Sequence, residues 1–377
     1  VRANGVIRDF YETLKEGSKT VIDRIILTGI TPVMLDDITS GFNISNNLSL
    51  KKKYNEMLGF TQDEVNTLME ETGIDPNMVN VDMELLYNGY LFHKDGEHRV
   101  YNPSMMLYLF DSILEEETVG NIIDDNLKTD YGRLRNLIQN DRNCEQLIKI
   151  AQDNCILSEI IPRFSIDKMH DSEYFISLLF YLGLLTVDRS EEGMTYLKIP
   201  NYSIRTIYWD YILHLIKDEN EDVMIDMIHQ KRAVKDLTGG NPKPYLDYIS
   251  QNILCRLSNR DLRNFNEKYI KIILLTGLFQ SRMYITITEL EVTRGYTDIY
   301  MQRSHLLPGI PYEWVWEIKY VRKEDADDKK NILKEKREEA RIQLNRYRET
   351  PLFAGRSDVR YLFLIFIGKD RYEMEEV

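Results

Sequence analysis

The sequence predicts an α/β domain in the last third of the chain and a mainly helical region before it. Runs rich in β-branched and aromatic residues, which favour strands, occur at 281–292, 295–303, 314–321 and 359–368. An amphipathic helical stretch at 262–279 precedes these runs, and a charged helical stretch at 333–349 lies before the last of them. A helix that connects two strands permits parallel pairing. We therefore expect a mixed sheet flanked by helices.

Length and composition indicate an ordinary globular protein. The chain has 377 residues, 43% hydrophobic and 29% charged, which suits two or three domains. No run approaches the roughly 18 apolar residues of a membrane helix, and no signal-peptide pattern opens the sequence. The three cysteines are scattered, which argues against a disulfide framework or a structural zinc site. We expect a cytoplasmic protein that spans no membrane.

The first of three predicted regions, 1–125, contains signals for several short elements. Helical stretches are expected at 6–16, 51–58, 61–72 and from Pro103 onward. Residues 21–30, VIDRIILTGI, have the aliphatic composition of a buried strand. A small hairpin is expected about Asp95-Gly96.

The second predicted region, 126–260, is mainly helical. Within it, residues 172–201 have the pattern of a helix, a turn at Gly183 and two short strands. A winged helix ends with a helix and a strand hairpin, so residues 160–205 form either a winged-helix-like segment or a plain helical domain with a surface hairpin. The residues leave both possibilities open. The third region, 261–377, contains the predicted α/β domain.

Three acidic residues and one lysine lie on neighbouring strands of that domain. Glu289 lies near the end of the first strand and Asp298 lies in the second. The third strand carries Glu317, with Lys319 two residues on, so these two side chains point to the same face. Alone, such a pair is most simply an exposed ion pair on an edge strand. Carboxylates from adjacent strands also form sites for Mg²⁺ or Mn²⁺, where a lysine stabilises charge on a phosphate.

This pattern resembles the PD-(D/E)XK nuclease superfamily, which has an acidic residue on its second core strand and (D/E)-x-K on the third. Here the motif reads GYTDIYM, which contains Asp298, and WEIKY, which contains Glu317 and Lys319. Thr297 stands where the name of the superfamily has Pro. The resemblance implies the superfamily fold for residues 261–377.

An upstream acidic residue and a following helix extend this resemblance. Glu289 in ITELEV fits the upstream position, with Glu291 as its rival, and Gln343 in EARIQLNRY fits the helix. The resemblance implies hydrolysis of phosphodiester bonds with Mg²⁺ or Mn²⁺ held by Glu289, Asp298 and Glu317. The residues that it implies to be catalytic are Asp298, Glu317, Lys319 and Gln343.

Almost the whole chain, including ILTGITPVMLDD and VYNPSMMLYLF, also resembles bacterial AAA-ATPase-like proteins with a C-terminal PD-(D/E)XK domain. The resemblance implies that residues 1–125 are the end of an AAA-type domain, with Thr28 and Gly29 near a nucleotide. The sequence contains no G-x-x-x-x-G-K-[ST] loop, and GSKT at 17–20 is only a near miss. ATP is therefore expected only if a phosphate-binding loop precedes Val1.

Charge leaves two classes of function open. The net charge of −13 argues against coating of nucleic acid through the overall field. Residues 333–348 carry six basic residues against three Glu, which either contact phosphates or form pairs along the helix. The first hypothesis is a metal-dependent nuclease acting on DNA or RNA, coupled to an ATPase-like module. The alternative is a non-catalytic scaffold that binds nucleic acid or protein, and an ATPase is possible only with a loop before Val1.

Overall fold

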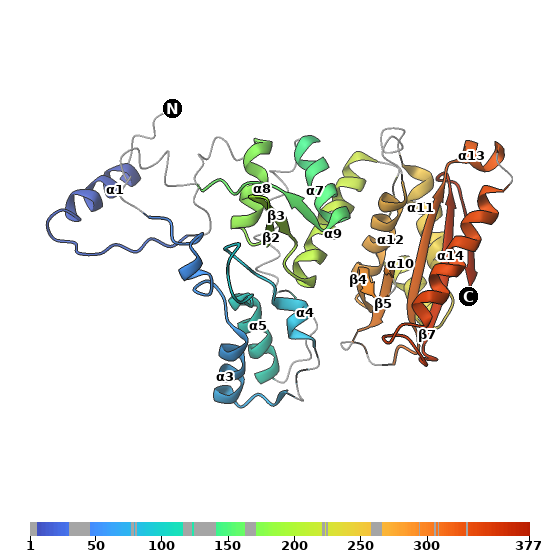
Figure 1. The fold of residues 1–377 in the computed structure, drawn as a ribbon, viewed down its shortest axis with the longest axis horizontal. Coiled ribbons are helices and arrows are strands. Elements are labelled where there is room, and N and C mark those ends of the chain that lie inside the picture. Colours follow the sequence, from blue (N-terminus) through green and yellow to red (C-terminus); the bar gives the residue numbers. More distant parts are fainter. Residues whose placement is uncertain are drawn as a thin grey trace. The chain divides into compact units, whose positions relative to one another are not determined.

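The computed structural model describes the chain in two compact units, residues 1–208 and 209–377, and each unit is described by itself (Figure 1). The described residues are 6–29, 46–76, 79, 81–115, 123, 141–162, 171–220, 223, 225–257, 266–293, 295–304, 307, 309–328 and 331–377. Among these residues no helix is long and apolar enough to cross a membrane. The domain boundaries expected near 125 and 260 stay predictions.

The first unit combines short helices with one small sheet. Its helices are α1 (Val6–Gly17), η1 (Lys52–Tyr54), α3 (Gln62–Thr72), α4 (Met83–Tyr87), α5 (Pro103–Leu114), α7 (Asp141–Asp153), α8 (Ser172–Tyr181) and the start of α9 (Tyr202–Glu219). The strands β1 (Cys155–Leu157), β2 (Thr186–Glu191) and β3 (Met194–Lys198) pair in the order β1-β3-β2. Local signals explain two helix starts. Thr61 forms a capping box with Glu64 before α3, and Asn102 caps α5, whose first residue is Pro103.

Most of the short elements predicted for this unit are confirmed. The helices at 6–16 and 61–72, the helix from Pro103, and the helix with a strand hairpin at 172–201 are all present. The hairpin expected about residue 95 is reduced to an isolated bridge between Tyr90 and Val100. The winged-helix interpretation of the later segment stays a prediction.

The buried strand predicted at 21–30 is wrong for the residues of it that the structure describes. Residues 21–29 form no strand, and Val21 and Ile26 are 85% and 88% exposed. An aliphatic run becomes a strand only where a neighbour takes its hydrogen bonds and a core covers its side chains. Among the residues that the structure describes, no strand pairs with residues 21–29 and Val21 and Ile26 are not covered, so composition alone is misleading.

The second unit has a five-stranded sheet packed between helices. After the end of α9 come α10 (Met227–Thr238), α11 (Lys243–Asn252), η5 (Leu254–Arg256), α12 (Glu267–Ser281), β4 (Tyr284–Val292), β5 (Gly295–Arg303), β6 (Glu313–Val321), α13 (Lys323–Asp328), α14 (Ile332–Arg348), β7 (Val359–Ile367) and β8 (Arg371–Glu376). The sheet order is β4-β5-β6-β7-β8. β6 and β7 are parallel and the other pairs are antiparallel. The mixed sheet is therefore confirmed, and from α12 onward the sequence analysis did not predict α13 and β8.

The two faces of this sheet pack against different helices (Figure 1). On one face Trp316 lies against Tyr245 of α11, and the Trp314 indole donates to a carbonyl of α10. On the other face Val315 and Phe363 belong to a core that includes Leu344 of α14. Alternation along β6 therefore sends its tryptophans towards α10 and α11, and its odd-numbered residues towards α14.

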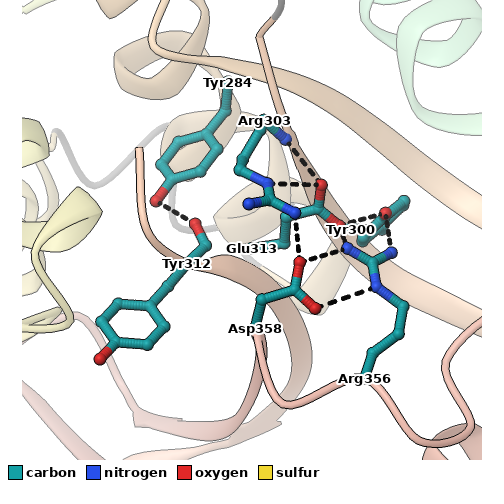
Figure 2. Close-up of polar contacts among 7 residues, drawn as sticks. All are labelled: Tyr284, Tyr300, Arg303, Tyr312, Glu313, Arg356 and Asp358. Carbon is teal, nitrogen blue, oxygen red and sulfur yellow. Dashed lines mark hydrogen bonds and ion pairs between the residues drawn. The ribbon is translucent and has the colours of Figure 1, made fainter. Parts of the chain in front are cut away.

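A cluster of ion pairs around the buried Glu313 holds the start of β6 to its neighbours (Figure 2). The Glu313 carboxylate is 4% exposed and accepts hydrogen bonds from the Tyr300 hydroxyl at 2.6 Å and from Arg356 at 2.7 Å. Arg303 also bonds to Glu313, and both arginines pair with Asp358, which lies just before β7. Because every charge has partners, the cluster fixes β5, β6 and the entry to β7 in one arrangement.

Candidate active site

β5 and β6 stop pairing next to the acidic residues singled out in the sequence. Their ladder covers only three residue pairs, and the pair nearest these acidic residues joins Ile299 to Trp316. The same register, continued by one pair, places Asp298 opposite Glu317. There the Asp298 carboxylate itself accepts the backbone N–H of Ile318, at 2.8 Å. β5 and β6 thus separate around the Asp298 carboxylate, which places Asp298 of β5 next to Glu317 of β6.

Glu317 and Lys319 form a buried pair on the middle strand of the sheet. They are 2% and 7% exposed, and the Lys319 ammonium donates to Glu317 Oε1 at 2.7 Å. The Tyr347 hydroxyl, on α14, donates to Glu317 Oε2 at 3.3 Å. The interpretation of this pair as an exposed edge-strand ion pair is therefore wrong. Burying two charges carries a large desolvation cost, which a purely structural position rarely needs.

Burial is the main reason that the pKa of Glu317 is raised to about 7, and the negative charge of Asp298 adds to it. Lys319 and the Tyr347 hydroxyl oppose this rise. For Lys319, burial acts to lower the pKa, but the carboxylates of Glu317, Glu267 and Asp298 outweigh it, so that the pKa is raised. The lysine is thus held as an ammonium beside two carboxylates that repel each other.

One side of α14 lies along this pair. Glu339, Gln343 and Tyr347 are four residues apart and so fall on one helix face. Glu339 lies 3.7 Å from the Lys319 ammonium, and Tyr347 contacts Glu317. Gln343 lies between these two in the sequence, and its Oε1 is buried with no hydrogen-bond partner among the described residues. It is therefore an acceptor that a bound ligand could use.

Two charged residues of α12 also belong to the site, and the sequence analysis did not identify them. The Lys271 ammonium lies 2.8 Å from Asp298 Oδ1 and is almost buried. Glu267 precedes it by one helical turn, and burial together with the charge of Asp298 raises its pKa. The signal that could have found them is Lys271 itself, a charge inside the apolar run YIKIILL on a helix buried over most of its length.

Glu289 lies at the edge of this group. In the β4–β5 ladder Thr288 pairs with Ile299 and Leu290 pairs with Thr297, so Glu289 stands opposite Asp298. Its carboxylate is 3.7 Å from the Lys271 ammonium, and its side chain is 46% exposed. The Glu289 backbone has a φ of 52°, which is uncommon for a residue other than glycine. Its rival Glu291 is also exposed.

The donor set fits a hard divalent cation such as Mg²⁺ or Mn²⁺. Asp298 and Glu317 offer carboxylate oxygens, and the repulsion between them is what a divalent cation would offset. The Gln343 Oε1 atom on α14 is a further oxygen, and it has no hydrogen-bond partner in the part of the chain that the structure describes. Within the described residues, however, no group of three His, Cys, Asp or Glu side chains that could hold a metal ion is present. Mg²⁺ commonly keeps several waters, so a site with few protein ligands suits it.

Two of the basic residues of α14 pair with carboxylates of β8. Arg337 pairs with Glu373 at 2.5 Å, and Arg341 pairs with Glu375. Lys336 pairs along the helix with Glu339, at 2.7 Å. Pairs within the helix account for only part of this charge. The pairs with β8 were not expected, because the sequence analysis did not predict this acidic strand.

Comparison with known proteins agrees with this geometry. Residues 265–376 match the family model described as the PD-(D/E)XK nuclease superfamily. The match covers α12 through β8, and so contains every site residue named above. No curated protein and no solved structure matches the chain. The second unit therefore contains a PD-(D/E)XK nuclease superfamily domain.

Proposed function

We propose that this protein is a metal-dependent nuclease that hydrolyses phosphodiester bonds of nucleic acid at the split between β5 and β6. The observation that carries the proposal is the convergence of Asp298, Glu317 and Lys319 at the point where the strands diverge. Chance matches to D…E-x-K are common in sequences, but they do not place the three side chains on one buried site. The superfamily match over the same residues supports the chemistry.

Each residue has a role that follows from its surroundings. Asp298 and Glu317 would hold Mg²⁺ or Mn²⁺, which when bound supplies an activated water and neutralises charge on the phosphate. Lys319, kept as an ammonium, stabilises the negative charge that grows on the phosphate oxygens. Gln343 offers its unpaired oxygen to orient the attacking water or the substrate. Tyr347 holds the Glu317 carboxylate in place.

A cleavage assay with matched lysine variants tests the proposal. Labelled single-stranded and double-stranded DNA and RNA are incubated with Mg²⁺ or Mn²⁺ and the full chain. Lys319→Met should reduce cleavage at least about a hundredfold, which is the scale of losing one charge-stabilising group. Lys323→Met is the matched control, because Lys323 is an exposed lysine that pairs with Asp370 on the surface. Cleavage that survives in Lys319→Met would place the activity elsewhere.

Glu289 as a third metal ligand is a separate part of the proposal. Glu289→Gly removes the carboxylate and at the same time suits the left-handed backbone at this position. A loss of activity in this variant therefore reports on the carboxylate and not on backbone strain. Unchanged cleavage at limiting Mn²⁺ would exclude Glu289 from metal binding. The same change at Glu291 tests its rival.

The non-catalytic scaffold remains the competing hypothesis, and the pairing of two α14 arginines with β8 favours a scaffold that binds protein, because these two charges are already engaged by carboxylates. A folded protein that cuts none of the four substrates with either metal would support the scaffold.

Coupling to an AAA-type module is the finer part of the hypothesis, supported by the sequence resemblance of residues 1–125. This chain has no phosphate-binding loop motif, so ATP should bind only to a protein in which such a loop precedes Val1. Titration of the chain with a fluorescent ATP analogue checks this, and saturable binding to residues 1–377 would contradict it.

A further inference from the structure

Lys271 places a fixed positive charge on the acidic side of the site. Its ammonium lies 2.8 Å from Asp298 Oδ1 and 3.7 Å from Glu289 Oε1. The residue is 9% exposed and comes from the second turn of α12. The cation is therefore built into the fold and is not a mobile surface lysine.

The position of this ammonium bears on how many metal ions the site holds. A nuclease with two metal ions needs a second carboxylate to help hold the second ion. Asp298 and Glu289 are the carboxylates from neighbouring strands that face each other across β4 and β5. Lys271 contacts both of them. An ammonium and a divalent cation a few ångströms apart repel strongly where water is scarce.

The charges around the site are consistent with this arrangement. Asp298 and Glu317 are each paired with one lysine, Lys271 and Lys319 respectively. The Lys271 ammonium thus lies against both Asp298 and Glu289, where a second ion shared by these two carboxylates would have to bind. Glu267 adds one further carboxylate nearby.

We infer that Lys271 takes the place of a second divalent cation, so that the site holds a single Mg²⁺ or Mn²⁺ ion together with a built-in ammonium. The inference rests on the proposed function, since it concerns the metal that the function requires. Lys271 acts as a positioning residue for Asp298 and determines the metal stoichiometry.

The test is a titration of the full chain with Mn²⁺ alone, followed by calorimetry and by electron paramagnetic resonance of free Mn²⁺. Wild type should bind one ion. Lys271→Met, which keeps the length of the side chain and removes its charge, should bind two ions, or bind the first at least about tenfold more tightly. Lys271→Arg keeps the charge and should bind one ion with wild-type affinity. Lys323→Met is the control for net charge, because Lys323 is an exposed lysine that pairs with Asp370 on the surface.

The outcomes separate this inference from the proposed function. Two ions in wild type would overturn the inference and leave the nuclease proposal standing, whether or not Lys271→Met folds. The same stoichiometry and affinity in wild type and in a folded Lys271→Met protein would overturn it as well. No Mn²⁺ binding in wild type, with a folded protein, would contradict the metal-dependent function itself and the inference with it.

Discussion

The raised pKa of Glu317 predicts a pH dependence of stability that one substitution should remove. In the unfolded chain this carboxyl titrates near 4.5, and in the folded protein its pKa is about 7. Between these values the folded state holds a proton that the unfolded state has lost, so the free energy of unfolding falls as the pH rises. One pKa unit corresponds to about 1.4 kcal/mol, and the whole shift therefore to about 3 kcal/mol. Glu317→Gln removes this titration.

Tryptophan fluorescence is a suitable assay, because all three tryptophans, Trp209, Trp314 and Trp316, are buried in the second unit. Urea unfolding is followed in the presence of a chelator between about pH 4.5 and pH 8. Relative to Glu317→Gln, wild type should lose about 3 kcal/mol of stability over this range. Glu267, whose pKa is also raised, titrates in both proteins and cancels in the comparison.

Parallel pH profiles for the two proteins would refute the argument that burial and the charge of Asp298 raise the pKa of Glu317. Excess Mg²⁺ adds a second comparison, since a cation at this carboxylate favours its ionised form. The wild-type profile should then flatten towards that of Glu317→Gln. A profile that Mg²⁺ does not change would leave the pKa argument intact and exclude Glu317 as a metal ligand.

Three further substitutions separate structural from catalytic residues. Glu313→Ala should lower the free energy of unfolding by about 1–3 kcal/mol, because Arg303 and Arg356 each lose a charge-assisted hydrogen bond but are partly exposed and keep Asp358 as a partner; urea unfolding measures this, and Mn²⁺ affinity of the folded variant should not change. Gln343→Leu removes a buried acceptor that has no hydrogen-bond partner among the described residues, so the free energy of unfolding should change by less than about 1 kcal/mol or rise. The cleavage rate should fall at least about tenfold. An unchanged rate would exclude Gln343 from the reaction. Tyr347→Phe loses the hydrogen bonds of its hydroxyl and should cost about 1 kcal/mol in urea unfolding, and an unchanged stability would show that these bonds contribute nothing.

The sequence predicted the order of α12, β4, β5, β6, α14 and β7 because each of these elements carries its own local signal. Alternating or continuous apolar runs marked β4 to β7, and helical spacing marked α12 and α14. β8 was missed because RYEMEE is acidic and only partly buried, and such a strand depends on the neighbour with which it pairs. The strand predicted at 21–30 failed for the opposite reason, since its residues are apolar but those the structure describes have no partner.

The residues of the site also differ in how far the sequence could predict their contacts. Two residues on one strand share a face by geometry alone, so Glu317 and Lys319 could be paired from the sequence. That the pair is buried on a central strand, and that Asp298 occupies the gap beside it, depends on where β5 and β6 stop pairing. Lys271 reaches Asp298 because helix packing brings together residues far apart in the chain, which no local pattern encodes. The sequence by itself determined which residue types stand on which strands. Only the tertiary structure decided which charges meet, because that depends on packing between elements.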